Sequence, residues 1–315
     1  MKQPPKKATL GHLRTEQRNR ASAHLDQETT LDLVRIINRE DAKVAGAVRK
    51  ALPQIAKAVD VIAERLRRGG RLIYVGAGTS GRIAALDASE CPPTFGTDPR
   101  QVQFVIAGGP KALGAAVEAN EDSREFGQRD IAERKPQKND VVVGIAASGR
   151  TPYTVAAVEY ARKCGAATIG ICCNDGSPLA NTAQIAIVAS VGPEVLSGSS
   201  RMKAGTAQKM ILNMLTTGAM TRLGYVYGNL MVNVKPNNEK LVDRAIRILQ
   251  DAAEIDQSTA AHALKASGNN VPVALVMLKA KLSPTQAQRR LKAQSGNVRR
   301  AIKSQPPNPP STLSS

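Results

Sequence analysis

Five short, nearly continuous apolar runs, separated by helical stretches, constrain the fold of this 315-residue chain more than any other feature. The runs occupy residues 71–76, 102–107, 140–146, 167–172 and 184–189. Strands that are apolar at nearly every position are typical of a parallel sheet covered on both faces. The stretches between most of them have helical patterns, at residues 81–90, 111–127 and 153–164. This alternation predicts an α/β fold with a doubly wound, five-stranded parallel sheet.

Helical periodicity dominates on both sides of this region. Apolar residues recur every three or four positions over residues 31–62, with an interruption expected at Pro53. A long helix is predicted over residues 200–223, and further helical patterns cover residues 239–265 and 271–302. The predicted organisation is an N-terminal arm and helix over residues 1–46, an α/β domain over 47–225, a small helical region over 226–303 and a disordered tail over 304–315.

Composition narrows the classes of function. No apolar run approaches the roughly 18 residues of a membrane span, and no apolar stretch follows the basic N-terminus, so we expect a cytoplasmic protein without a membrane partner. Four cysteines without a CxxC pair, two of them adjacent, and three isolated histidines predict neither a metal site nor a disulfide framework. The net charge of +18 is interpreted as a solvated surface on a protein that handles anionic metabolites. Nucleic acid is the weaker alternative, because no aromatic residues interleave the basic ones.

Two glycine- and hydroxyl-rich turns follow predicted strands and open predicted helices, at residues 76–82 and 146–152. Taken alone, each is also compatible with an ordinary strand–helix connection. Together they would meet at the carboxyl edge of a parallel sheet, where backbone N–H groups and short hydroxyls suit a phosphate and a sugar. The residues predicted to bind substrate here are Thr79, Ser80, Ser148, Gly149 and Thr151.

Both turns resemble those of the sugar isomerase (SIS) domain, which has a flavodoxin-like sheet. Residues 192–209 are similar to the signature shared by N-acetylmuramic acid 6-phosphate etherases and the glucokinase regulatory protein. Residues 15–19, 86–96 and 229–236 resemble the etherase branch, so that the resemblance covers about residues 12–302. One departure is Arg20, where the etherases usually have proline.

The resemblance implies an etherase that cleaves the D-lactyl ether of N-acetylmuramic acid 6-phosphate during cell-wall sugar recycling. Water replaces lactate, and the products are N-acetylglucosamine 6-phosphate and D-lactate. The family uses two glutamates, no metal and no cofactor, and it forms homodimers. By motif, the catalytic residues are Glu90 and Glu121, and Glu194 and Ser199 are further substrate contacts.

Two carboxyl groups with separated pKa values suit this reaction. One takes the proton at carbon 2 of the opened sugar, and the other protonates the departing lactyl oxygen. Glu90 is expected to close a helix before Pro92 and Pro93, and a surface position at that helix end is the alternative. Glu121 stands in an acidic stretch that is also compatible with a solvated helix face.

Two other functions remain open at this stage. One is a non-catalytic phosphosugar-binding regulator of the SIS type, and the other is a phosphosugar isomerase. An etherase needs both Glu90 and Glu121, whereas a sensor needs neither of them.

Overall fold

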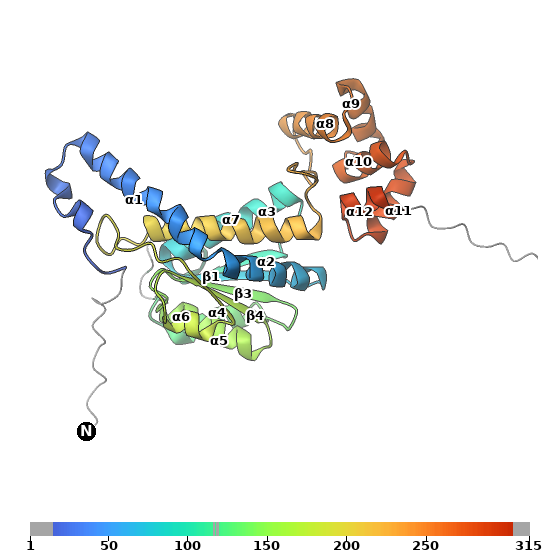
Figure 1. Cartoon of the computed structure of the whole chain (residues 1–315). Helices are drawn as coiled ribbons and strands as arrows, with labels where there is room; N and C mark the ends of the chain where they lie inside the picture. The colour runs from blue at the N-terminus through green and yellow to red at the C-terminus, as the bar shows by residue number, and fades with distance from the viewer. Residues whose placement is uncertain (1–14, 116, 118–119, 305–315) are drawn as a thin grey trace, which may run out of the picture. The chain divides into compact units, whose positions relative to one another are not determined.

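The computed structural model describes residues 15–115, 117 and 120–304 in two compact units (Figure 1). Unit 1 comprises Met1–Cys91 and Asp98–Ala219, and unit 2 comprises Pro92–Thr97 and Met220–Ser315. Nearly all of the predicted tail, from residue 305 on, lies outside the described residues. The two units are described separately below.

The described part of unit 1 is built on one five-stranded sheet. Its strands are β1 (Leu72–Gly76), β2 (Val102–Ile106), β3 (Val141–Ile145), β4 (Ala167–Cys172) and β5 (Ile185–Val188). The order is β2-β1-β3-β4-β5, and every pairing is parallel. The predicted doubly wound parallel sheet is therefore confirmed, with strands within about a residue of the predicted runs. This order is flavodoxin-like, and its topological switch point lies between β1 and β3.

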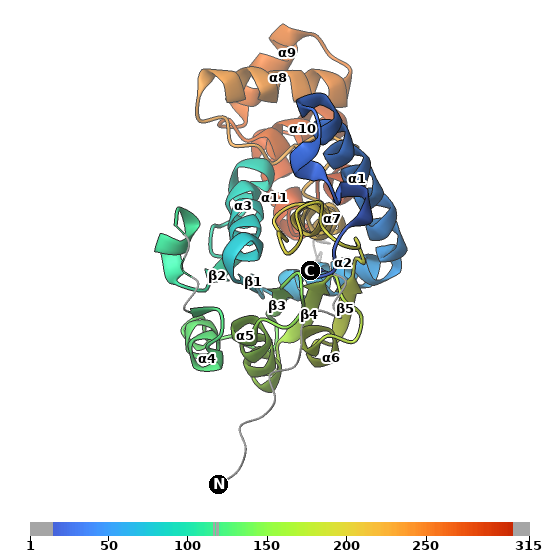
Figure 2. The ribbon, with the colours of Figure 1, turned by 90° about the vertical axis from the view of Figure 1, so that its left-hand side faces the viewer.

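Helices cover both faces of this sheet. In Figure 2, α4, α5 and α6 lie along one face, and α2, α3 and α7 lie along the other. The domain boundary predicted between residues 46 and 47 falls inside α1, which is continuous across it. The bounds are α1 (Thr30–Lys50), α2 (Leu52–Arg67), α3 (Gly78–Phe95), α4 (Arg124–Ala132), α5 (Pro152–Lys163), α6 (Pro178–Thr182) and α7 (Lys203–Leu223), with 3-10 turns η2 (Arg20–Ser22), η3 (Leu25–Gln27) and η4 (Gly109–Leu113).

Two predicted helix boundaries are wrong. The helix expected over residues 111–127 is replaced by η4, a loop and α4. Ser123 caps α4 by accepting a hydrogen bond from the Phe126 backbone N–H at 3.1 Å, so that this helix begins only at Arg124. Glu90 does not end its helix, because α3 continues through both prolines to Phe95.

Unit 2 is helical in its described part. Its helices are α8 (Glu239–Ala253), α9 (Gln257–Ala266), α10 (Val271–Ala280), α11 (Pro284–Ala293) and α12 (Val298–Lys303). Each begins after an Asn, Asp or Ser whose side chain accepts a hydrogen bond from the first turn. These caps explain why the patterns at residues 239–265 and 271–302 divide into five short helices. Their apolar faces enclose a core that includes Leu249, Leu264 and Val276.

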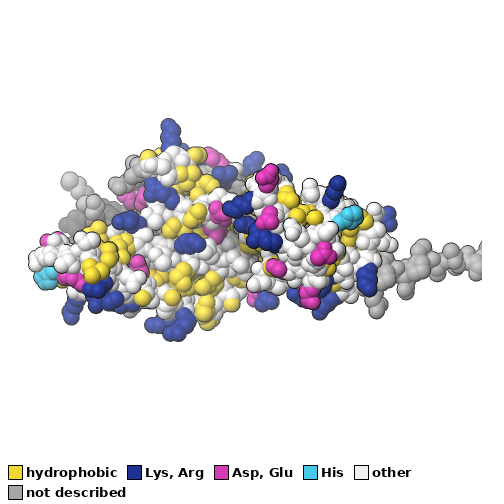
Figure 3. Space-filling view, turned by 90° about the horizontal axis from the view of Figure 1, so that it is seen from above, with side chains coloured by type: hydrophobic (Ala, Val, Ile, Leu, Met, Phe, Trp, Pro, Cys, Tyr) yellow, Lys and Arg dark blue, Asp and Glu magenta, His cyan; other side chains and the backbone are white. Residues whose placement is uncertain are grey.

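The surface is strongly basic but finely mixed. On the face drawn in Figure 3, Lys and Arg side chains are scattered among other residues and do not form one continuous patch. Within the described ranges, none of the helices combines the length and the apolar character that crossing a membrane requires.

Candidate active site

The two glycine- and hydroxyl-rich turns leave neighbouring strands at the switch point of the sheet. β1 and β3 pair directly, with Gly76 in register with Ile145, and each turn starts at that end of its strand. A Cβ at Gly76 would lie 3.2 Å from the Ile145 carbonyl oxygen, so glycine permits this close approach. The crevice outside the carboxyl ends of such strands is where ligands bind in open α/β sheets. The structure thus brings the two predicted turns together.

The first turn enters α3 earlier than expected. The helix begins at Gly78, whose φ is +52°, so that Thr79 and Ser80 lie in its first turn. The first backbone N–H groups of a helix have no intrahelical acceptor, and the helix dipole adds positive potential there. Ser80 is buried and Thr79 is half-buried. This end of α3 can therefore accept an anionic group from the crevice.

The second turn presents hydroxyl groups at the start of α5. Gly149 has a φ of +68°, and a Cβ there would lie 2.2 Å from Ser177 Oγ. Ser148 Oγ accepts a hydrogen bond from the Arg150 backbone N–H at 3.2 Å, which leaves its own proton for a ligand. Thr151 occupies the N-cap position, but its side chain makes no capping bond. Both hydroxyls are consequently able to donate to an oxyanion.

Glu121 lies between the two turns. Its backbone carbonyl oxygen accepts a hydrogen bond from the Tyr153 N–H at 3.1 Å, which fixes it beside the start of α5. A Cβ at Gly78 would lie 3.0 Å from Glu121 Oε1, so the carboxylate reaches the start of α3. The side chain is half-buried. A carboxylate is thus held at the edge of the predicted phosphosugar site.

Glu90 is placed elsewhere on the same subunit. It is exposed on α3, twelve residues beyond Gly78. At 1.5 Å per residue, the two positions are about 18 Å apart along the helix axis. Since Glu121 reaches Gly78, a single subunit does not bring the two predicted catalytic glutamates together. Gly78 and Glu90 belong to the same continuous helix, which fixes this separation.

Glu194 has a structural role that the sequence did not reveal. Its side chain is fully buried, and its two carboxylate oxygens accept hydrogen bonds from the backbone N–H groups of Lys203 and Ala204, each at 2.9 Å. It thus caps α7 and completes the loop before that helix. Its predicted contact with substrate stays a prediction, as does that of Ser199.

The loop that carries Ser199 does approach the first turn. A Cβ at Gly205, near the start of α7, would lie 3.6 Å both from Thr79 Cγ2 and from the Ser200 carbonyl oxygen. Ser199 and Ser200 are half-buried. The Ser199–Ser200 segment, the start of α7 and the start of α3 therefore form one wall of the crevice.

A buried ion pair anchors this wall to the N-terminal arm. Lys203 Nζ donates to Glu40 Oε2 at 2.7 Å, and both side chains are almost fully buried. Asn19 Nδ2 donates both to the same carboxylate, at 2.9 Å, and to the Pro193 carbonyl oxygen, at 3.2 Å. Ser22 Oγ donates to the Val195 carbonyl oxygen at 2.7 Å. The arm therefore fixes the loop that leads to Ser199.

The arm also contacts the second turn. Thr15 is buried, and its Oγ1 accepts a hydrogen bond from Asn174 Nδ2 at 3.3 Å. The same amide lies 3.4 Å from the carbonyl oxygens of Ala147 and Ser148. The first and last residues of the motif at 15–19, Thr15 and Asn19, thus both make contacts within their own subunit. No charge or periodicity pattern in the sequence pointed to Asn174, Glu40 or Lys203 as partners of this arm.

Other polar groups near Glu90 support the fold. Asp87 is buried, and it accepts hydrogen bonds from Tyr74 OH at 2.8 Å and from Thr216 Oγ1 at 3.2 Å. Burial raises the pKa of Asp87. Burial, with the nearby charges of Asp87 and Glu90, raises the pKa of Cys91 to about 12, so this thiol stays protonated and is a poor nucleophile. In the part of the chain that the structure describes, no cluster of three or more His, Cys, Asp or Glu could hold a metal ion.

Comparisons with known proteins give concordant matches. A family model described as the glucokinase regulatory protein N-terminal SIS domain matches residues 54–162, and a SIS domain model matches residues 135–218. An N-acetylmuramic acid 6-phosphate etherase of Aeromonas hydrophila is 53% identical over 289 residues, which cover 92% of this chain and 97% of that protein. One from Pasteurella multocida is 54% identical over 288 residues, covering 91% and 96%.

Among solved structures, similarity extends to a phosphoheptose isomerase from Francisella tularensis. It is 20% identical with a TM-score of 0.48, and the match covers 62% of this chain and 100% of that one.

Proposed function

The chain belongs to the N-acetylmuramic acid 6-phosphate etherase family, and from this membership we infer that it is a carbon–oxygen lyase acting on N-acetylmuramic acid 6-phosphate. It cleaves the D-lactyl ether and adds water, and the products are N-acetylglucosamine 6-phosphate and D-lactate. The observation that carries this conclusion is 53% identity over nearly the whole of both chains. The SIS domain and the etherase resemblance expected from the sequence are confirmed by the same matches.

The crevice of unit 1 supports binding of the phosphosugar. The start of α3, with its backbone N–H groups and helix dipole, and the hydroxyls of Ser148 and Thr151 are suitable partners for phosphate oxygens. Ser199 and Glu121 border the same space and are proposed to contact the sugar. The phosphate then fixes the sugar with its reacting carbons directed toward a carboxylate.

Elimination followed by hydration needs a base and an acid, and Glu90 and Glu121 are proposed to supply them. One carboxylate removes the proton from carbon 2, which lies next to the aldehyde of the opened sugar. The other, as a carboxylic acid, protonates the lactyl oxygen as its bond to carbon 3 breaks. Water then adds across the resulting double bond at carbon 3. The carboxyl group that took the proton from carbon 2 returns a proton to that carbon, and the other carboxylate takes a proton from the attacking water. Both carboxyl groups thereby regain their starting protonation states.

We propose that a homodimer completes this site. Because Glu90 lies about 18 Å along α3 from Gly78, which the Glu121 carboxylate reaches, the two glutamates meet in one site only when Glu90 comes from the partner copy. The exposure of Glu90 and of its neighbour Leu86, which is 49% exposed, leaves this face of α3 open to such a copy. The expected cytoplasmic location stays a prediction.

Release of D-lactate from N-acetylmuramic acid 6-phosphate by the purified chain is the direct test. Glu90→Gln and Glu121→Gln should each lower the rate by at least about 10²–10⁴-fold, since the amide retains the shape but cannot exchange a proton. Glu125→Gln, on the exposed surface of α4, is the matched control and should leave the rate unchanged. A wild-type rate in Glu90→Gln or in Glu121→Gln would rule out a catalytic role for the residue that was replaced.

Mixing the two inactive variants tests the shared site. In a twofold-symmetric dimer, a mixed pair has one site with both glutamates and one with neither, so random exchange of subunits restores about one quarter of the activity. If each site used glutamates of one subunit, the mixture would stay inactive. That outcome would contradict the shared site while leaving the etherase assignment intact.

The match to the regulatory-protein domain favours one alternative, a non-catalytic phosphosugar sensor. Binding of N-acetylmuramic acid 6-phosphate without any D-lactate release would establish it.

A further inference from the structure

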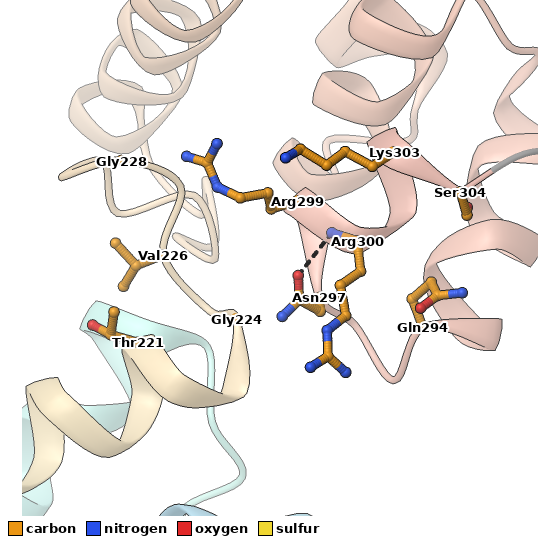
Figure 4. Close-up of a pocket in the computed structure, with 10 residues that line it drawn as sticks. All are labelled: Thr221, Gly224, Val226, Gly228, Gln294, Asn297, Arg299, Arg300, Lys303 and Ser304. Atoms are coloured by element: carbon orange, nitrogen blue, oxygen red, sulfur yellow. Dashed lines mark hydrogen bonds between the residues drawn. The ribbon is translucent and has the colours of Figure 1, made fainter.

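A basic pocket in unit 2 has no role in the reaction proposed above. It has a volume of about 640 Å³ and lies between the end of α7, the segment that follows it, and α12 (Figure 4). None of the residues predicted for catalysis or phosphosugar binding lines it. Its lining residues are Thr221, Gly224, Val226, Gly228, Gln294, Asn297, Arg299, Arg300, Lys303 and Ser304.

The charge of this pocket is entirely of one sign. Three cations line it, Arg299, Arg300 and Lys303, and no carboxylate does. Among the described residues, none of the three forms an ion pair, whereas Arg247 in the same unit pairs with Asp243 at 2.7 Å. Like charges held in one concave surface repel each other and attract anions from solution. The pocket therefore has no negative charge of its own to balance its three cations, and an anionic ligand could provide it.

The polar groups of the pocket are held in place by their neighbours. The Arg299 guanidinium lies over the Tyr227 ring, 4.5 Å from its centroid, in a cation–π contact. Asn297 Oδ1 accepts a hydrogen bond from the Arg300 N–H at 2.9 Å, which leaves the amide Nδ2 as a donor. A Cβ at Gly224 would lie 2.2 Å from that Nδ2, so the opposite wall approaches closely only because it is glycine.

The cations divide into two groups. In Figure 4, the Lys303 side chain extends toward Arg299, whereas the Arg300 side chain points away from both. Guanidinium groups bind phosphate and carboxylate oxygens in a bidentate manner, and an ammonium group adds a point charge. Two separated positive centres match a ligand with two oxyanionic groups. The volume lies within the range of small-molecule sites.

We propose that this pocket binds a small polyanion, a phosphorylated metabolite with two oxyanionic groups, at a site separate from the predicted catalytic residues. One group of the ligand is held by Arg299 and Lys303, and the other by Arg300. The lining residues include no Asp or Glu, so no carboxylate repels an anion in the pocket. They also include no aromatic ring on which a base could stack, which favours a small anion over nucleic acid.

Calorimetric titration of the full chain with inorganic pyrophosphate, at low ionic strength in phosphate-free buffer, tests the proposal. Arg300→Gln with Lys303→Gln removes two of the three cations and keeps the Arg299–Tyr227 contact. This variant should bind pyrophosphate at least about tenfold more weakly, because each charged hydrogen bond contributes that much or more. The matched control is Arg289→Gln with Lys292→Gln, on the exposed surface of α11, which should bind as the unaltered chain does.

Two further measurements separate this site from other sources of binding. Ser148→Ala reports any pyrophosphate held by the crevice of unit 1, and it should leave the contribution of the basic pocket unchanged. Hydrogen exchange of the unaltered chain, which needs no variant, should show slower exchange over residues 221–228 and 294–304 when pyrophosphate is added.

Three results would overturn the proposal. One is equal affinity in the Arg300→Gln, Lys303→Gln variant, and another is an equal loss in the α11 control, which would indicate surface charge alone. The third is tighter binding of a short DNA duplex than of pyrophosphate, together with a loss of DNA affinity in the Arg300→Gln, Lys303→Gln variant.

Discussion

The ion pair between Glu40 and Lys203 allows a sharp prediction about stability. The two side chains are 4% and 1% exposed, so removing one partner leaves a charge that water cannot reach. Glu40→Leu leaves the Lys203 ammonium without its carboxylate and should destabilise the fold by about 4–5 kcal/mol. Lys203→Met should cost less, about 3 kcal/mol, because Lys43 and Asn19 still donate to Glu40.

The double variant Glu40→Leu, Lys203→Met tests whether the loss in each single variant comes from the charge that is left unpaired. With both charges replaced by apolar side chains of similar size, stability should return to within about 1 kcal/mol of the unaltered chain. Lys43→Met, which removes a partner whose side chain is 63% exposed, is the control and should cost less than about 1 kcal/mol. Urea denaturation, followed by circular dichroism, measures each free energy of unfolding.

The same pair predicts the acid sensitivity of unit 1. Burial alone would raise the pKa of Glu40, but hydrogen bonds from Lys203, Lys43 and Asn19 outweigh it and lower the pKa to about 2 from 4.5. The stabilisation is therefore complete above about pH 4.5 and is lost as the pH falls toward 2. In Lys203→Met the folded-state pKa rises, so acid unfolding should begin at higher pH.

Two results would refute this reasoning. One is a loss below about 1 kcal/mol in Glu40→Leu, which would mean that the Lys203 ammonium finds water or another acceptor. The other is an acid-unfolding curve of Lys203→Met that coincides with that of the unaltered chain.

Three further predictions concern the crevice. Ser148→Ala should weaken binding of the 6-phosphorylated sugar about 10–100-fold by calorimetry and barely change binding of the unphosphorylated sugar; equal weakening of both would place the phosphate elsewhere. Gly149→Ala should lower the melting temperature and weaken the same binding, because φ is +68° and the new Cβ meets Ser177; an unchanged melting temperature would show that the turn can relax. D-lactate release should continue undiminished in excess EDTA, since the two-glutamate reaction uses no metal, and a loss restored by one divalent ion would contradict that scheme.

The parts of the structure that follow from short stretches of sequence were predictable. Strands such as β3 and β4 are apolar at nearly every position, and this pattern identifies them without knowledge of their neighbours. The turns at Gly78 and Gly149 combine a positive φ with hydroxyl residues, and both signals are local. Placing the two turns together required only the rule that parallel strands share a carboxyl edge.

The parts that depend on distant residues were not predictable in the same way. Glu40 and Lys203 are separated by 163 positions, and on an amphipathic helix a charged residue is normally solvent-exposed. Glu194 was interpreted as a substrate contact because its position at the end of a strand does not reveal the backbone groups it caps. The separation of Glu90 from Glu121 is not a local property, because it depends on a contact of the Glu121 carboxylate with Gly78, 43 positions earlier in the chain.

The discontinuity of unit 2 has a consequence for synthesis on the ribosome. Pro92–Thr97 belongs to unit 2, and Gly96 packs so closely on Asn233 that a Cβ there would lie 2.6 Å from the Asn233 carbonyl oxygen. At usual translation rates, this short segment emerges on the order of ten seconds before the residues that it packs against. During that interval Phe95, buried in the finished protein, has no native partner from the unit it joins. During synthesis the end of α3 therefore lacks its neighbours from unit 2, and expression of residues 220–304 alone omits the Gly96 segment that packs against Asn233.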